Sequence, residues 1–260
     1  MGSHKFAPSL LVTIILLSPS LLHRDPFSKW ILWNVGQGQF LTLSKPKNCW
    51  HFDLGGERAP WPEILNECQY KENRISISHW DWDHLSLLNL IRQKIQNTCL
   101  DYGPPGPPPS PKKARILKRI PHCKTPHTEV SWTEIRWTGP PPKTSNGLSR
   151  VFYDRHSKLL IPGDSPQKQE LSWSTQNRLV IAPTQFLILG HHGSQSSSSK
   201  TLLNHLPHLK LGLVSARKKR YGHPHRKISQ RFQKLGIPLI QTEYWGHIII
   251  PVPTSTAEGY

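Results

Sequence analysis

The residues with the clearest chemical potential in this chain are the two histidines and two aspartates of segment 79–84: His79, Asp81, Asp83 and His84. The segment follows an apolar, β-prone run at 74–78, so it begins where a strand is expected to end. Imidazole nitrogen and carboxylate oxygen together bind divalent cations, and this ligand density suffices for two ions roughly 3.5–4 Å apart. We predict a metal site here; the alternative is an acidic, solvated loop.

Further residues of metal-binding type follow other apolar runs or lie in nearby turns: Asp53, Asp164, His191, His192 and His223. Taken singly they are weak signals, because an aspartate after glycine is most often a turn residue. Ligands at strand ends are held by a rigid sheet, as a catalytic site requires. Together with segment 79–84 they predict one site at a sheet edge.

The elements that must position these residues alternate between strands and helices. Strands are expected at 30–35, 40–43, 50–53, 74–78, 130–137, 149–153, 158–161, 185–189, 211–215, 238–242 and 247–252. Helices are expected at 62–70, at 85–96, at 200–206 and up to Leu235, with Gly236 as the stop. This alternation predicts a layered α/β sandwich.

A proline-rich stretch at 101–111 predicts a surface loop, because proline lacks the amide donor and fixes φ. A basic segment, 112–119, follows it. That segment is either a solvated loop or a nucleic-acid contact.

The chain is strongly basic, with 33 Lys and Arg against 16 Asp and Glu and a net charge of +17. Such an imbalance favours polyanionic partners, either nucleic acid or anionic lipid headgroups. Five cations flank the turn that contains His223: Lys218, Lys219, Arg220, Arg226 and Lys227. If His223 binds metal, they lie at the mouth of the site and favour a phosphate backbone as substrate.

Residues 1–24 form a signal-like or membrane-anchoring segment, with an uncharged apolar run at 7–22 that is short for a membrane span. We expect export, to the periplasm or to a membrane-anchored position outside the cytoplasm; the alternative is a buried strand or helix. Residues 25–260 are expected to be one domain.

The four cysteines form no Cys-x-x-Cys pair, which argues against a structural zinc module. In an exported chain, one or two disulfides can form, and Cys99 with Cys123 would bracket the proline-rich loop.

The ordered motifs carry a family resemblance. They are Asn-Val-Gly-Gln-Gly at 34–38, Phe-Asp-Leu-Gly at 52–55, segment 78–84, Pro-Gly-Asp at 162–164, His-His-Gly-Ser at 191–194 and Tyr-Gly-His-Pro at 221–224. From about 30 to 250 the chain resembles the metallo-β-lactamase-fold domain of the ComEC DNA-internalisation competence proteins. The resemblance implies an αββα sandwich, a dinuclear metal site at one edge of the sheets, and a nuclease that acts on an incoming DNA strand.

The resemblance also implies residue roles. His79 and Asp81 would hold one ion, Asp83 and His84 the second, and Asp164 would bridge them, so that Asp83 and Asp164 lie at the catalytic centre. His191 and His223 resemble the later histidine ligands, with His192 outside the ligand set, although the sequence does not settle which of His191 and His192 faces the metal. Asp53 would orient a ligand from outside. The chain departs from the family pattern at Gln39, commonly acidic, and at Leu87 and Leu88, commonly glycines.

We therefore predict a metal-dependent hydrolase that uses two divalent ions, zinc or manganese, to activate water for cleavage of single-stranded DNA. Trp80 and Trp82 would either stack on bases or pack in the core. The multi-span membrane channel of full-length family members is not found in this sequence, so we expect a standalone relative with a membrane channel as its partner. Three rival readings stay open: a small-ester metallohydrolase, a non-catalytic DNA-binding module with a degenerate metal site, and a basic protein of the membrane surface.

Overall fold

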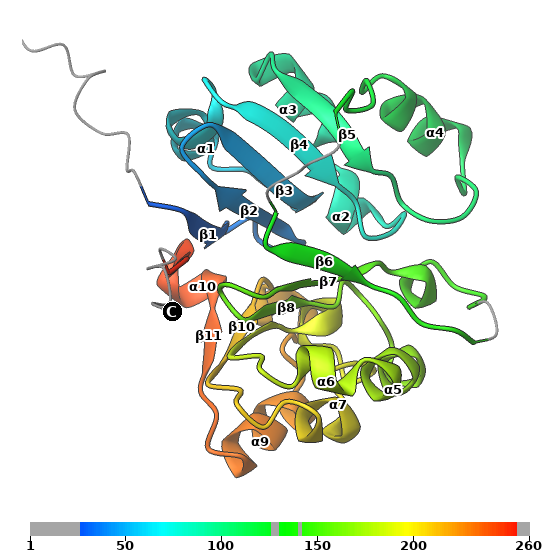
Figure 1. Ribbon diagram of the computed structural model, residues 1–260, viewed down its shortest axis with the longest axis vertical. Coiled ribbons are helices and arrows are strands. Elements are labelled where there is room, and N and C mark those ends of the chain that lie inside the picture. The colour runs from blue at the N-terminus through cyan, green and yellow to red at the C-terminus, as the bar shows by residue number, and fades with distance from the viewer. Residues whose placement is uncertain (1–26, 126–129, 140–141, 254–260) are drawn as a thin grey trace, which may run out of the picture.

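Two six-stranded sheets pack face to face, and helices cover both outer faces (Figure 1). This computed structural model describes residues 27–125, 130–139 and 142–253. Sheet A has the strand order β12-β1-β2-β3-β4-β5, and sheet B has the order β11-β10-β9-β8-β7-β6. The architecture is the αββα sandwich that the sequence predicted.

All eleven predicted strands are present, and β5 is an additional one. Sheet A contains β1 (Lys29–Leu32), β2 (Phe40–Ser44), β3 (Asn48–Leu54), β4 (Glu72–Ser76), β5 (Thr98–Tyr102) and β12 (Ile248–Pro251). Sheet B contains β6 (Trp132–Ile135), β7 (Val151–Asp154), β8 (Leu159–Ile161), β9 (Phe186–Ile188), β10 (Leu211–Val214) and β11 (Leu239–Gln241). The strands β3 and β4 pair in parallel, as do β8, β9 and β10, so the carboxyl ends of each set lie at one edge of its sheet.

Helices pack against each sheet through buried apolar side chains. Sheet A is covered by α1 (Trp61–Cys68), α2 (Trp82–Leu85), α3 (Leu88–Lys94) and α4 (Pro111–Lys118). Sheet B is covered by α5 (Gln167–Gln176), α6 (Arg178–Ile181), α7 (Lys200–Asn204) and α9 (Arg226–Lys234). The remaining short helices are α8 (Lys218–Tyr221), α10 (Thr242–Trp245) and two 3-10 turns, Asn146–Leu148 and Gly190–Gly193.

A third core lies between the sheets and is rich in aromatic rings. Alternate residues of a strand point to opposite faces, so Trp50 and Phe52 of β3 face sheet B while Cys49 faces the helices. The Phe52 ring centroid lies 5.0 Å from that of Phe152 and 5.2 Å from that of Trp132, both on sheet B. This packing fixes the two sheets to each other, and therefore the strand ends that carry the predicted ligands.

The helices differ from prediction at three places. The helix expected at 85–96 is divided into two helices, α2 and α3. Leu87 lies between them and Leu88 is the first residue of α3, and both are buried in the core between sheet A and its helices. The basic segment expected as a loop forms α4, which begins at Pro111 after Ser110, whose hydroxyl accepts from the Lys113 amide. The helices α5 and α6 were not predicted, because the α5 sequence is mostly polar and lacks a regular apolar spacing.

Two disulfides join sheet A to its surroundings. Cys99 of β5 bonds Cys123, the pair that the sequence suggested, and Cys49 of β3 bonds Cys68 at the end of α1.

The apolar run at 7–22 lies outside the described residues. None of the helices in the described residues combines the length and apolar character needed to cross a membrane.

Candidate metal centre

The predicted ligands come together where strands of both sheets end. Sheet A contributes Asp53 at the end of β3 and segment 79–84 after β4, whereas Asp164 follows β8 and His191 and His192 follow β9 of sheet B. The His191 amide donates to the Gly163 carbonyl at 3.2 Å and so joins the two loops of sheet B. The Gln39 amide donates to the Asp83 carbonyl at 2.9 Å and so joins segment 79–84 to the residue before β2. The site is thus assembled from both halves of the chain.

Four side chains, Asp83, His84, Asp164 and His192, offer ligand atoms that all lie within 4.8 Å of one another. His84 Nε2 is 3.0 Å from Asp164 Oδ1, and His192 Nε2 is 3.2 Å from Asp83 Oδ2. Asp164, His84 and His192 are buried, and Asp83 is half-buried. Two imidazoles and two carboxylates at these separations form a set of donors that suits a divalent cation.

The hydrogen bonds of the histidines decide which nitrogen faces the cluster. His192 Nδ1 lies 3.0 Å from the Ser215 carbonyl oxygen, which can only accept, so Nδ1 carries the proton. His84 Nδ1 likewise donates to Asp53 Oδ2, at 2.8 Å. In the neutral rings the Nε2 atoms therefore carry the lone pairs and face Asp83 and Asp164, as ligation requires.

His79 is held in the same way, through Ser78. The Ser78 hydroxyl donates to Asp53 Oδ2 at 2.8 Å and so accepts from His79 Nδ1 at 2.9 Å. Asp53 also accepts from the Ser78 amide at 2.7 Å and from Gln39 Nε2 at 2.9 Å. One buried carboxylate thereby orients two imidazoles, and Gln39 serves as its donor at the position where the family pattern is commonly acidic.

A second group of ligand atoms adjoins the first across Asp164. Asp164 Oδ2 lies 3.8 Å from His79 Nε2 and 3.7 Å from His191 Nε2. His79 Nε2 is also 3.5 Å from Asp81 Oδ2. Asp164 lies near both groups, the placement that a bridging ligand needs.

The unpartnered atoms and the charges of the centre fit a cation. His79 Nε2 and Asp164 Oδ1 are buried and, within the described part of the chain, form no hydrogen bond of good geometry. Burial disfavours the charged forms, but Asp164 and Asp53 nevertheless raise the pKa of His84 well above its usual value. Burial likewise opposes ionisation of Asp164, yet His84 and His192 hold its pKa well below the usual range. Without metal, the protonated His84 ring would balance the negative charge of the Asp164 and Asp53 carboxylates.

The backbone is strained at the site. Asp53, His191 and His192 have left-handed φ angles of 57°, 49° and 54°, which are uncommon for residues other than glycine. Such conformations persist when surrounding contacts over-determine them, and they cluster at functional sites. Gly55 allows the close approach of β3 and α2, since a Cβ there would lie 2.0 Å from the Asp83 carbonyl oxygen.

The three later histidines lie in different places relative to the cluster. His192, whose role relative to His191 the sequence left open, is one of the four clustered residues, whereas His191 is one-third exposed and its Nε2 lies 3.7 Å from Asp164 Oδ2. Both residues have a left-handed backbone, which turns both rings toward the centre. The alternation of side chains along a strand therefore could not predict which of the two histidines faces the metal site. His223 lies outside the four-residue group; its ring stacks on His191 with centroids 6.3 Å apart.

The two tryptophans of segment 79–84 have different environments. Trp80 is buried, and its indole donates to the Gly106 carbonyl, so it packs in the core and offers no face to a base. Trp82 is 39% exposed, and the ammonium groups of Lys112 and Lys113 lie 5.0 and 5.2 Å from its ring centroid. The basic helix α4 therefore lies beside Asp81 and Asp83, the residues on either side of Trp82.

The basic segment that contains His223 is divided between two helices. In α8, Arg220 pairs with Glu57 at 2.8 Å, Lys218 Nζ donates to the Pro224 carbonyl at 2.6 Å, and Lys219 is exposed. In α9, Arg226 and Lys227 are exposed in the first turn. The cations therefore surround the His223 turn on both sides.

Glu170 of α5 is a buried residue that the sequence did not single out. Its carboxylate accepts from the Ser198 amide at 2.5 Å and from the Ser199 amide at 2.8 Å, which fixes the serine loop after His192. A buried acid in a polar helix has no sequence signal, because only the fold brings it beneath the loop. Burial raises the pKa of Glu170 to about 7, against the lowering effect of the two amides.

We expect this raised pKa to make stability depend on pH. The folded protein keeps the Glu170 proton that the unfolded chain, with a pKa near 4.5, releases. The resulting stabilisation is complete below pH 4.5 and is lost as pH rises through 7, a change of roughly 3 kcal/mol. Urea unfolding at a series of pH values should show a shallower decline over this window in Glu170→Gln than in wild type. The exposed control Glu63→Gln should keep the wild-type slope; an equal slope in Glu170→Gln would contradict the assignment.

Comparison with solved structures defines the class of protein: the chain has the metallo-β-lactamase fold. The metallo-β-lactamase fold protein YhfI from Bacillus subtilis matches with a TM-score of 0.54 and 10% identity, over 86% of this chain and 99% of that chain. A diphosphatase of the PhnP family matches with a TM-score of 0.51 and 12% identity, over 87% of this chain and 99% of that chain. At these identities the likeness concerns the fold alone.

In sequence, the chain is weakly homologous to competence proteins, consistent with a ComEC-like domain. It is 25% identical over 255 residues to competence protein ComA of Neisseria gonorrhoeae, covering 95% of this chain and 35% of the relative. It is 30% identical over 112 residues to ComE operon protein 3 of Bacillus subtilis (strain 168), covering 42% of this chain and 14% of the relative. The chain thus spans about a third or less of the length of these relatives. No family model matches it.

Proposed function

We propose that this protein is a metal-dependent nuclease that cleaves single-stranded DNA during DNA uptake. Two divalent ions, zinc or manganese, are assigned to Asp83, His84, His192 and Asp164 on one side and to His79, Asp81, His191 and Asp164 on the other. When bound, such ions supply an activated water and neutralise charge on the phosphoryl oxygens. Asp53 keeps the His84 and His79 rings oriented for this task.

The observation that carries the choice of substrate is Trp82 with its two lysines. An exposed indole can stack on any base, and lysines bind phosphate, so this combination suits a single strand without sequence preference. Trp82 lies between the ligands Asp81 and Asp83, with Lys112 and Lys113 over its ring. A small neutral ester would use none of these groups.

The location and partners belong to the same proposal. The two disulfides support a position outside the reducing cytoplasm. The names of the competence relatives support a role in DNA uptake. A membrane channel that delivers the strand is the partner we propose, and residues 7–22 are assigned to membrane attachment.

The test is cleavage of labelled single- and double-stranded DNA by protein reconstituted with manganese or zinc, beside a phosphodiester and a carboxylic ester that each carry a chromogenic leaving group. We expect cleavage of the single strand and of the small phosphodiester. Turnover of the carboxylic ester alone would favour the small-ester reading. Binding of DNA by a protein that holds less than about one ion per chain, without any cleavage, would favour a degenerate binding module.

A further inference from the structure

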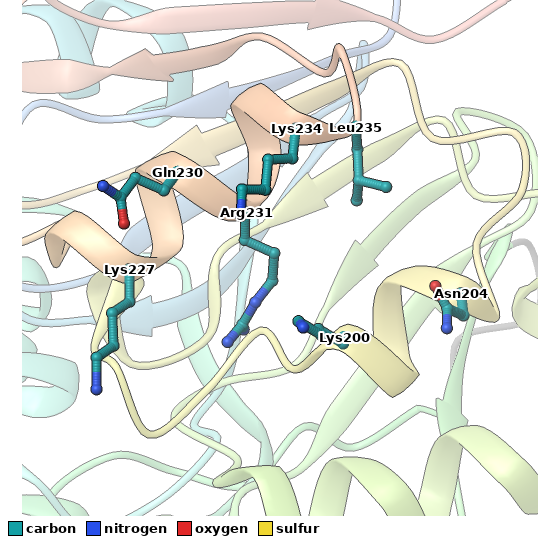
Figure 2. A pocket seen from close by; sticks show the side chains of 7 residues that line it. All are labelled: Lys200, Asn204, Lys227, Gln230, Arg231, Lys234 and Leu235. Atoms are coloured by element: carbon teal, nitrogen blue, oxygen red, sulfur yellow. The ribbon is translucent and has the colours of Figure 1, made fainter.

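A basic groove lies between α7 and α9 on the outer face of sheet B, away from the residues assigned so far to metal. Its volume is about 340 Å³. Four cations, two amides and one leucine line it: Lys200, Lys227, Arg231, Lys234, Asn204, Gln230 and Leu235. Figure 2 shows the Arg231 side chain extending from α9 toward Lys200 at the start of α7. We call this feature the α7–α9 groove.

The three lysines of the α7–α9 groove have no acidic partner among the residues that the structure describes. Lys200, Lys227 and Lys234 are exposed, and no ion pair involves them among the residues that the structure describes. Arg231 donates to the Ser198 carbonyl and, at 3.4 Å, to the Ser197 carbonyl. The carboxylate behind it, Glu170, is fully buried and directed to backbone amides. The groove therefore presents uncompensated positive charge.

The arrangement of charge on α9 disfavours the isolated helix. The pairs Lys227/Arg231 and Arg231/Lys234 are like charges at spacings of four and three residues, which repel on a helix surface. Lys227 also stands in the first turn, where a cation opposes the helix dipole, and α9 contains no acidic residue. A bound polyanion would relieve both effects.

The α7–α9 groove is connected to the metal centre through the start of α9. The His225 amide donates to the Gly193 carbonyl at 2.8 Å, and Pro224 packs against Gly193, the residue after His192. From there α9 carries Lys227, Arg231 and Lys234 away from the centre. A chain bound at the centre can therefore continue along this helix.

We propose that the α7–α9 groove binds the phosphodiester backbone of a nucleic-acid strand several nucleotides from the linkage that is cleaved. The lysines and Arg231 contact phosphate oxygens, and Gln230 and Asn204 add amide donors. The groove is concave, and Leu235 is its one large apolar residue, so it fits a strand better than a lipid surface. The inference rests on the proposed nuclease function and adds to it a binding surface outside the reaction centre.

The test compares two variants of equal charge change in the full-length protein. Lys200→Glu/Lys234→Glu alters the groove, and Lys47→Glu/Lys210→Glu alters exposed lysines at the strand ends opposite the metal centre. Binding of a long fluorescent strand with hydrolysis-resistant phosphorothioate linkages is measured by anisotropy over a range of salt. Loss of two phosphate contacts should lower the slope of log affinity against log salt by about 1.4 and weaken binding roughly 25-fold near 0.1 M salt. Hydrolysis of a small chromogenic phosphodiester should not change.

The outcomes separate this inference from the proposed function. A groove variant that binds the strand as the control variant does overturns the groove and leaves the nuclease proposal intact. A wild-type protein that cleaves no DNA, yet loses binding on groove substitution, overturns the nuclease and supports the groove. A groove variant that loses binding to anionic phosphatidylserine vesicles while keeping its affinity for the strand overturns the nucleic-acid assignment in favour of a membrane.

Discussion

Replacing Asp164 by asparagine is expected to abolish metal-dependent hydrolysis. Asp164 is the carboxylate shared by both groups of ligand atoms, with Oδ1 3.0 Å from His84 Nε2 and Oδ2 3.7 Å from His191 Nε2. Loss of a residue that merely orients a ligand typically costs 10–100-fold in metal affinity or activity. Loss of the shared ligand itself should cost at least about 100-fold, measured as the cleavage rate of a single strand and of a small phosphodiester.

The control for this substitution is Asp154→Asn. Asp154 is also buried, and it accepts from Trp30 Nε1 at 2.7 Å, but it ends β7, antiparallel to β8, and so lies at the opposite end of sheet B from Asp164. Both substitutions disturb a buried carboxylate, whereas only Asp164→Asn should lower the metal content, measured by mass spectrometry. Cleavage by Asp164→Asn at near the wild-type rate would refute the proposed centre.

Much of the fold followed from the sequence because its strands are short, apolar and bounded by glycine, proline or charged residues. The residues 159–161 and 186–188 illustrate this, since each is an apolar run that ends at a ligand loop. The parallel pairing of these strands brings Asp164 and His192 to one edge, a consequence that the strand order implies once the αββα sandwich is assumed. Among the elements that were not predicted, α5 shows the reason most clearly, because the fold and not apolar periodicity buries Trp173 and Glu170.

The site was less predictable in its details than in its location. His191 and His192 follow the same strand, and their left-handed backbone, which no residue pattern announces, decides how each ring faces the centre. The sequence left the basic segment after the proline-rich stretch as either a solvated loop or a nucleic-acid contact, because Lys112 and Lys113 reach Trp82 only through the placement of α4. Long-range contacts of this kind depend on packing, which composition and spacing do not encode.

Removal of metal should inactivate the protein and lower its melting temperature. The centre places His84, Asp83, Asp164 and His192 around one point, and although burial disfavours the charged form of His84, Asp164 and Asp53 raise its pKa well above the usual value. An ion present at 100 times its dissociation constant stabilises the folded state by about 2.7 kcal/mol, which corresponds to roughly 5–10 °C in a domain of this size. We expect dialysis against a chelator to cause a shift of this order, measured by calorimetry.

The choice of ion and of pH sharpens the same experiment. Because imidazole nitrogens supply half of the clustered ligands, zinc or manganese should restore stability and cleavage more effectively than magnesium or calcium, which prefer oxygen ligands. The ion must displace the proton from His84, so its apparent affinity should rise with pH. Asp164→Asn should gain little stability from either ion. A wild-type melting temperature and cleavage rate that ignore both chelator and added metal would mean that the buried cluster is a structural network of ion pairs.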